Sequence, residues 1–380
     1  MKIIHIIGAR PQFIKYFPIG RYISAHMPST TNLLIHTGQH YDYRMSRIFF
    51  DELGIKHPDY HIGAGSGPHG EQTGTILKEI ERILVRETPS AVIIYGDTNS
   101  TLGGALAAAK LHIPVVHIEA GLRSFNRNMP EEVNRVVADH VSTLLLCPSM
   151  AGVKNLENEG ITQKICTGAL ITAGYFKKHT LNATADKPVV INTGDVMQDV
   201  ILYTAAVAGK NSTIIKDMSL SAKEYYLLTV HRAENTDSAA RLCEIIKFVN
   251  KTSDNKAVVF PMHPRTKKMY RNSTAKFANN VRIVDPVGYF DLIQLLKNAK
   301  MLMTDSGGMQ KEAFWLAVPC ITLRNETEWI ETIESGWNVL FKNYRGKHKI
   351  LRNNLKCYGD GNAAKRIGEA IFALIANRTR

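Results

Sequence analysis

The sequence predicts an α/β protein built from two Rossmann-like domains, and three observations lead to this fold class. Short runs rich in β-branched residues recur along the chain and alternate with longer stretches of helical periodicity. This alternation is typical of parallel sheets covered by helices on both faces. One set precedes about residue 165, a second follows about residue 188, and 380 residues suffice for two or three domains of roughly 150 residues.

The first set of elements predicts an N-terminal Rossmann-like domain over residues 1–167. Apolar runs with strand character are followed by loops that carry glycine or charged residues, and helical patterns cover 72–86 and 101–111. The predicted strands of this domain are 3–7, 32–36, 91–95, 115–118 and 143–147.

The second set predicts a C-terminal Rossmann-like domain over 196–360. Helical patterns at 239–252 and 289–298 separate its strands, and a last helix within 361–380 has an apolar face that could pack back on the N-terminal domain. Between the domains, 168–195 is rich in glycine and proline and is predicted to be a hinge with a small insertion. The predicted strands of the second domain are 226–229, 257–261, 281–284 and 300–304.

Composition excludes several classes of protein. Mean hydropathy is −0.13 and no apolar run approaches the roughly 20 residues of a membrane span, so we expect a cytoplasmic chain without membrane contact. The five cysteines form no CxxC pair and have no histidine at zinc spacing, so we expect no metal. The net charge of +13 comes from basic residues spread along the chain, which favours a small polyanion such as a nucleotide over a nucleic acid.

Ligands of parallel sheets bind beyond the carboxyl ends of the strands, so the loops that follow the strands are the candidate sites. The segment after the first strand contains Arg10 and Lys15 near a predicted helix start, where both cations could meet a phosphate. A solvated Arg and Lys at a helix start explain this segment equally well. Two further strands are followed within two residues by Asp97 and Glu119, and Glu131 could open the next helix. Desolvation at a strand end raises the pKa of a carboxylate, so we predict acid/base roles, with helix capping or salt bridges as the alternative.

In the second half, one strand leads to Val-His-Arg-Ala-Glu-Asn at 230–235 and another leads to the turn Ser306, Gly307 and Gly308. The backbone N–H groups of this turn can face a diphosphate at the start of the following helix. Glu312 would lie about one helical turn further on, where a carboxylate can accept both hydroxyls of a ribose. An ordinary turn is the alternative, and the position between a strand and a helix is what favours binding.

With these motifs, the chain resembles the non-hydrolysing UDP-N-acetylglucosamine 2-epimerase family, whose members have the two-domain GT-B fold and act on nucleotide sugars. The resemblance runs over nearly the whole length, through GARPQFIK, GDTNST, HIEAGLR, MPEEVNR, VHRAEN, MHPRTKK, DPVGY, TDSGGMQKEA, TEWIE and YGDG. It implies an active site in the interdomain cleft, a homodimer, and neither NAD nor a catalytic metal. The implied catalytic residues are Asp97, Glu119, Glu131 and His231, and the implied UDP-sugar contacts are Arg10, Lys15, Arg135, His263, Ser306, Gly307, Gly308 and Glu312.

The resemblance also implies a mechanism. Elimination of UDP across C1 and C2 of the sugar leaves a glycal-like intermediate, to which UDP adds back after a proton returns on the other face. The forms QKEA and TEWIE look closer to the subgroup that epimerises UDP-2,3-diacetamido-2,3-dideoxy-glucuronate, so this substrate is favoured over UDP-N-acetylglucosamine. A hydrolysing 2-epimerase, or a GT-B glycosyltransferase that uses a UDP-sugar donor, are the alternative functions.

Overall fold

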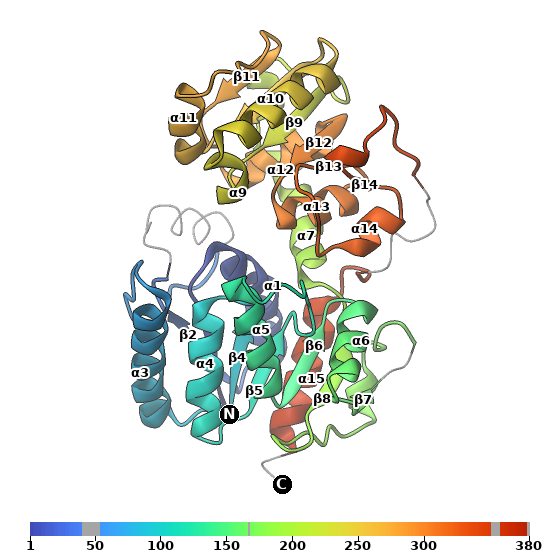
Figure 1. Ribbon diagram of the computed structural model, residues 1–380. Coiled ribbons are helices and arrows are strands. Elements are labelled where there is room, and N and C mark those ends of the chain that lie inside the picture. The colour runs from blue at the N-terminus through green and yellow to red at the C-terminus, as the bar shows by residue number, and fades with distance from the viewer. Residues whose placement is uncertain (40–53, 166–167, 351–357, 378–380) are drawn as a thin grey trace. The chain divides into compact units, whose positions relative to one another are not determined.

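The protein consists of two compact α/β units in the computed structural model, which describes residues 1–39, 54–165, 168–350 and 358–377 (Figure 1). The first unit comprises Met1–Val200 together with Lys356–Arg380, and the second comprises Ile201–Leu355. Each unit has its own parallel sheet with helices on both faces, so the predicted class of two Rossmann-like domains is confirmed.

The described strands of the first unit form an eight-stranded parallel sheet in the order β3-β2-β1-β4-β5-β6-β8-β7. Later strands are added outward from β1 on one side and from β4 on the other. Ligands of such a sheet bind at the carboxyl ends of these central strands. Its elements are β1 (Lys2–Ile7), α1 (Arg10–His26), β2 (Thr31–His36), β3 (Tyr60–His61), α3 (His69–Glu87), β4 (Ala91–Tyr95), α4 (Asn99–Lys110), β5 (Val115–Ile118), α5 (Pro130–His140), β6 (Leu144–Cys147), α6 (Met150–Asn158), β7 (Lys164–Ile165), the 3-10 turn η1 (Tyr175–Lys177), β8 (Val189–Asn192) and α15 (Ala363–Ala376).

Burial explains why these sequences form these elements. All five residues of β4 are buried, as expected for a central parallel strand with helices on both faces. Helix α3 buries Gln72, Ile76, Ile80 and Leu84, which are spaced four residues apart and therefore lie on one face. The apolar members of that face pack against β1, β2 and β4 in one core cluster.

The described strands of the second unit form a six-stranded parallel sheet in the order β11-β10-β9-β12-β13-β14. Here the strands are added outward from β9 on one side and from β12 on the other, which repeats the arrangement of the first unit. Its elements are α7 (Val196–Asn211), whose first turn belongs to the first unit, α8 (Ile214–Asp217), β9 (Tyr225–Thr229), α9 (Ala233–Thr236), α10 (Ala239–Ser253), β10 (Ala257–Pro261), α11 (Pro264–Arg271), β11 (Val281–Val284), α12 (Tyr289–Asn298), β12 (Met301–Thr304), α13 (Gly307–Trp315), β13 (Cys320–Thr322), α14 (Ile330–Glu334), β14 (Asn338–Leu340) and the 3-10 turn η2 (Phe341–Asn343).

The stretch 168–195, predicted to be an irregular hinge with an insertion, contains strand β8 of the first sheet. All four residues of β8 are buried, and the strand pairs with both β6 and β7. The pattern rules missed it because Pro188 and Gly194 flank a run of only four strand residues. Pairing with a neighbouring strand, which is a tertiary contact, makes this short run a strand.

Helix α15 packs against α1 and returns the end of the described chain to the first unit (Figure 1). Gly368 of α15 lies so close to the Tyr22 ring that a Cβ there would fall 2.3 Å from it. Arg366, which is 6% exposed, donates to Asp360 and to the carbonyl of Ile171. No helix among the described residues combines the length and apolar character that crossing a membrane requires.

Candidate active site

The loops after β1 and β4 are held together by one buried glutamine. Gln12, in the first turn of α1, accepts hydrogen bonds from the backbone N–H groups of Gly8 and Ala9 through Oε1. Its Nε2 donates to the carbonyl of Tyr95 at the end of β4, at 2.7 Å. Gly8 has no room for a side chain, because a Cβ would lie 2.1 Å from Ser100 Oγ. Gln12 therefore joins two loops at the carboxyl edge of the first sheet.

Lys15 and Glu119 form a close ion pair at this carboxyl edge, and their side chains are 9% and 10% exposed. Glu119 follows β5 directly and has a φ of 72°, a left-handed conformation that is uncommon outside glycine. Gly96 makes room for the pair, since a Cβ there would meet Glu119 Oε2 at 3.3 Å and Lys15 Nζ at 3.5 Å. The backbone thus aims the Glu119 carboxylate at the lysine despite the strain.

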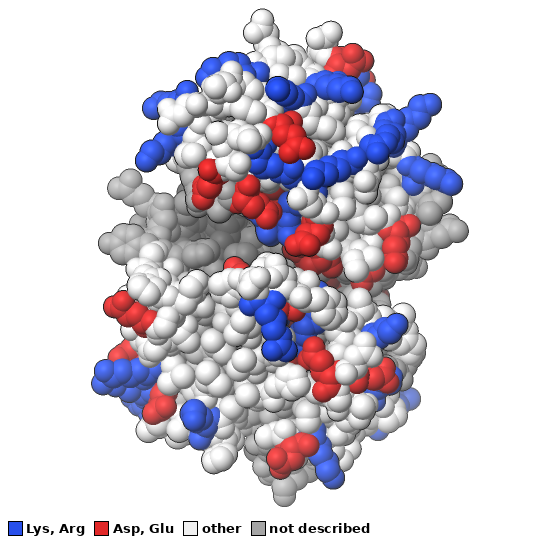
Figure 2. Space-filling model, viewed as in Figure 1, with Lys and Arg blue, Asp and Glu red and all other residues white. Residues whose placement is uncertain are grey.

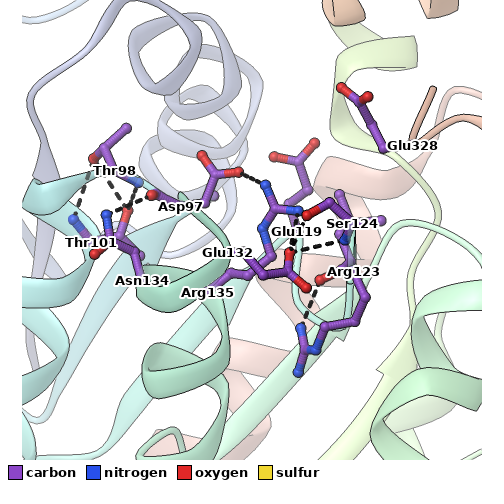
Figure 3. Close-up of polar contacts among 12 residues, drawn as sticks. Asp97, Thr98, Thr101, Glu119, Arg123, Ser124, Glu132, Asn134, Arg135 and Glu328 are labelled. Atoms are coloured by element: carbon purple, nitrogen blue, oxygen red, sulfur yellow. Dashed lines mark hydrogen bonds and ion pairs between the residues drawn. The ribbon is translucent and has the colours of Figure 1, made fainter. Parts of the chain in front are cut away.

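Asp97 follows β4 and bonds to Arg135 of α5, as Figure 3 shows. Its side chain is 34% exposed and that of Arg135 is 10% exposed. Desolvation raises the pKa of Asp97 above its ordinary value, Arg135 and Lys15 act in the opposite direction, and the charge of Glu119 adds to the rise. Asp97 and Glu119 thus belong to one electrostatic network, each bound to its own cation.

Two of the predicted residues of the first unit lie differently. Glu131 is exposed in the first turn of α5, whereas the Asp97 and Glu119 side chains pair with Arg135 and Lys15. Arg10 opens α1, and its side chain lies outside what the structure describes. The acid/base role of Glu131 and the binding role of Arg10 stay predictions.

In the second unit, Asp305 organises the loop that carries His231. Asp305 follows β12, is fully buried, and accepts hydrogen bonds from the backbone N–H groups of His231 and Arg232 at 3.0 Å. It also accepts from Asn235 Nδ2. The imidazole of His231 is 48% exposed, with Nδ1 at 3.3 Å from Asp305 Oδ1. A buried carboxylate therefore orients the loop after β9 and leaves the histidine accessible.

The predicted Ser-Gly-Gly turn begins α13. The Ser306 hydroxyl accepts from the N–H of Met309 at 3.5 Å and caps the helix, while the Ser306 N–H donates to Thr304 Oγ1. Gly308 is exposed, and a Cβ built on it would meet no atom of the chain within 4 Å. The helix therefore begins with free space beside its backbone N–H groups, which is the arrangement that suits a phosphate.

Glu312 lies on the same helix and is 5% exposed. Tyr289, at the start of α12, donates its hydroxyl proton to Glu312 Oε1 at 3.0 Å. This bond fixes one oxygen of the Glu312 carboxylate. His263, predicted as a UDP-sugar contact, is exposed after β10.

Gln12, Asp305 and Glu132 were missed by sequence reasoning, although the structure gives each a central place. Asp305 had the same signal as Glu119, a carboxylate directly after an apolar strand, and could have been found by that rule. Gln12 and Glu132 carried no such signal, because their partners are set by tertiary contacts.

Charge is unevenly divided between the units. The second has 23 Lys and Arg against 14 Asp and Glu, whereas the first has 24 against 20. On the face that Figure 2 shows, blue and red side chains are interspersed. The described residues contain no group of three or more His, Cys, Asp or Glu that could hold a metal ion.

Comparison with known proteins places this chain among sugar-nucleotide enzymes. A family model described as UDP-N-acetylglucosamine 2-epimerase matches residues 25–372. The chain is 46% identical to a UDP-N-acetylglucosamine 2-epimerase homolog of Methanococcus maripaludis, with 98% of this chain and 99% of that protein covered. It is 42% identical to the UDP-2,3-diacetamido-2,3-dideoxy-D-glucuronate 2-epimerase of Pseudomonas aeruginosa, with 98% and 100% covered.

Among solved structures, the UDP-GlcNAc 2-epimerase of Methanocaldococcus jannaschii in complex with UDP-GlcNAc and UDP is similar over 98% of this chain and 99% of that one, with a TM-score of 0.79 and 39% identity. The sequence matches and the structural likeness both extend over almost the whole chain. This chain therefore belongs to the UDP-N-acetylglucosamine 2-epimerase family.

Proposed function

We propose that this protein is a UDP-2-acetamido-sugar 2-epimerase in which the first unit supplies the acid/base groups and the second binds UDP. The observation that carries this assignment is the pair of carboxylates Asp97 and Glu119, each bound to its own cation at the carboxyl edge of the first sheet. Family membership supports it, and so does the capped start of α13 with open space at Gly308.

The proposed chemistry inverts C2 in two steps. A carboxylate removes the C2 proton, a C1–C2 double bond forms, and UDP leaves C1 with the electron pair of the glycosidic bond. A proton then reaches C2 from the other face and UDP attacks C1. This sequence needs a base, an acid and a clamp for UDP. We assign proton transfer to Asp97 and Glu119, with Glu131 as the third candidate.

We assign UDP and sugar contacts as follows. Ser306, Gly307 and Gly308 bind the diphosphate at the start of α13, where the N–H groups and the helix dipole favour an anion. Glu312 accepts the ribose hydroxyls, and Tyr289 holds its carboxylate in place. The remaining proposed contacts of the UDP-sugar are Arg10, Lys15, Arg135, His231 and His263.

We propose UDP-2,3-diacetamido-2,3-dideoxy-glucuronate as the preferred substrate over UDP-N-acetylglucosamine. The two positions that resemble the glucuronate subgroup contact each other, because Lys311 Nζ of QKEA lies 3.6 Å from the ring centroid of Trp329 in TEWIE. Lys311 is 2% exposed, so the QKEA and TEWIE segments pack against each other. The relative from Pseudomonas aeruginosa, named for that substrate, is 42% identical.

Turnover in D2O with each of the two UDP-sugars tests both proposals. Epimerisation at C2 must place deuterium at C2 of the product. Oxygen-18 placed in the bridge between C1 and the β-phosphorus must also scramble into the other oxygens of the β-phosphate, because the C1–O bond breaks and the freed phosphate rotates. Product without deuterium and without scrambling contradicts elimination. Faster turnover of UDP-N-acetylglucosamine contradicts the substrate preference and leaves the epimerase assignment intact.

The same reaction mixtures distinguish the alternatives. A hydrolysing 2-epimerase releases UDP and free sugar in equal amounts, and a glycosyltransferase releases UDP only when an acceptor is added. We further propose a homodimer, as family resemblance implies. Light scattering of the purified protein tests this, and a mass near 42.4 kDa contradicts it.

A further inference from the structure

Glu132 lies in the first turn of α5, next to the exposed Glu131, and its carboxylate accepts several hydrogen bonds. It is 2% exposed. Its Oε2 accepts from the Ser124 N–H and the Ser124 hydroxyl at 2.9 Å, and from Arg135 Nη1 at 3.1 Å. Its Oε1 accepts from the Phe125 N–H at 2.9 Å. One buried carboxylate thus joins the loop after β5 to the arginine that binds Asp97 (Figure 3).

We propose that Glu132 is a positioning residue that holds Arg135 against Asp97 and fixes the turn at Ser124 and Phe125. This inference rests on the acid/base role proposed above for Asp97. Glu132 itself bonds to Arg135 and the loop, so its effect on proton transfer passes through Arg135.

The backbone conformation at residue 125 must be stabilised by contacts with another part of the chain. Phe125 has a φ of 58° and is 79% exposed, so neither its backbone preference nor burial of its ring explains the conformation. The hydrogen bonds from Ser124 and Phe125 to Glu132 provide this stabilisation. Charge-assisted bonds to a buried carboxylate are stronger than neutral ones, which lets them outweigh the strain.

The guanidinium of Arg135 divides its donors between two carboxylates. Nη1 bonds to Glu132 and Nη2 to Asp97, so the contact with Glu132 sets the position from which Arg135 reaches Asp97. Among the described residues, the charged groups with the largest effect on the pKa of Asp97 are Arg135 of α5, Glu119 after β5 and Lys15 of α1. The positive charge of Arg135 lowers the pKa of Asp97, so displacement of Arg135 by itself raises that pKa.

The test is Glu132→Gln. An amide offers one oxygen acceptor, so in either orientation its NH2 group faces an N–H donor of the loop or of Arg135. We expect the pKa of Asp97, followed by carbon-13 NMR of labelled aspartate carboxyls and assigned with Asp97→Asn, to shift by about half a unit or more. We expect kcat to fall roughly tenfold, because Arg135 is misplaced, with UDP affinity unchanged.

Three comparisons make the test specific. Glu132→Asp keeps the charge and should recover part of kcat. In an Arg135→Ala background, Glu132→Gln should lower kcat no further, since the arginine through which it acts is gone. Glu157→Gln, which removes a carboxylate of α6 that pairs with the exposed Lys164 of β7, should leave kcat and the pKa of Asp97 unchanged.

An unchanged pKa of Asp97 in Glu132→Gln overturns the proposal, and so do additive losses with Arg135→Ala or an aspartate variant no better than the glutamine one. If Glu132→Gln unfolds, the aspartate variant and its pKa shift carry the test. Full activity of Asp97→Asn instead contradicts the proposed function, and the NMR titration still reports on Glu132 in that case.

Discussion

Single residues of the first unit combine charge neutralisation with strain. Glu119 is held at a φ of 72° and is paired with Lys15 across 104 positions of sequence. Asp97 is paired with Arg135 and has a raised pKa because of desolvation. A raised pKa moves the Asp97 carboxyl toward neutral pH, which favours the proton transfer proposed for it.

Removing either carboxylate should therefore affect chemistry more than binding. Asp97→Asn and Glu119→Gln keep the shape of the side chain and remove its proton acceptor, and each should lower kcat by roughly 10² or more. UDP affinity, measured by calorimetry, should stay within about twofold because UDP binding is assigned to the second unit. Near-normal kcat in both variants would sink the acid/base assignment.

A residue-scale prediction for the second unit concerns Glu312. Glu312→Gln should weaken UDP binding by about 1.5–3 kcal/mol, the contribution of a hydrogen bond to a charged group. Tyr289→Phe is the matched control, since it removes the bond that orients Glu312 and leaves the carboxylate itself, and it should cost less than about 1.5 kcal/mol. Unchanged UDP affinity in Glu312→Gln, by calorimetry, would remove Glu312 from the ribose site.

At the scale of elements, α13 is covered on one face and open at its start. Gly307 faces the segment after β13, where a Cβ would lie 2.5 Å from Glu328 Oε1 and 3.3 Å from Trp329 Nε1. Gly308, one position on, faces open space. The two glycines therefore have different reasons to be glycine, one for packing and one for access to the backbone.

This difference predicts that alanine substitutions at the two glycines affect stability and UDP affinity differently. Gly307→Ala should lower stability by about 1–3 kcal/mol through overpacking against Glu328, and UDP affinity should fall with it. Gly308→Ala should leave the melting temperature unchanged and still weaken UDP binding, because its methyl group occupies the space proposed for the diphosphate. Thermal melts and calorimetry on both variants are the measurements. Normal UDP affinity in Gly308→Ala would contradict the diphosphate assignment.

For the whole molecule, the chain leaves the first unit within α7 and returns near residue 356. The two passages are tied together in the first unit by Asp199 of α7, which accepts from the N–H groups of Ala363 and Ala364 at the start of α15. Burial raises the pKa of Asp199 to about 6, although these two donors favour the charged form.

The raised pKa makes stability depend on pH. The folded chain binds the Asp199 proton more tightly than the unfolded chain, so this contribution is fully present below about pH 4 and is lost as pH rises through about 6. The difference in free energy of unfolding between wild type and Asp199→Asn, from urea unfolding, should therefore fall by at most about 3 kcal/mol between pH 4 and 7.5. A difference independent of pH would contradict the titration of Asp199.

The sequence by itself determined the fold class and the positions of most central strands. The strand predictions at 91–95 and 115–118 match β4 and β5, because a strand buried on both faces reads as a local apolar run. Family membership also followed from motifs that are contiguous in sequence. The roles of the site residues stay predictions.

Only the tertiary structure decided which groups meet. Strand β8 exists because β6 and β7 offer it partners, and its flanking proline and glycine hid it from local rules. Lys15 pairs with Glu119, and Arg135 bridges Asp97 and Glu132, while Glu131 in the same motif stays exposed. Such pairings depend on the packing of α1 and α5 beside the sheet, and helix packing brings together side chains that no local pattern relates.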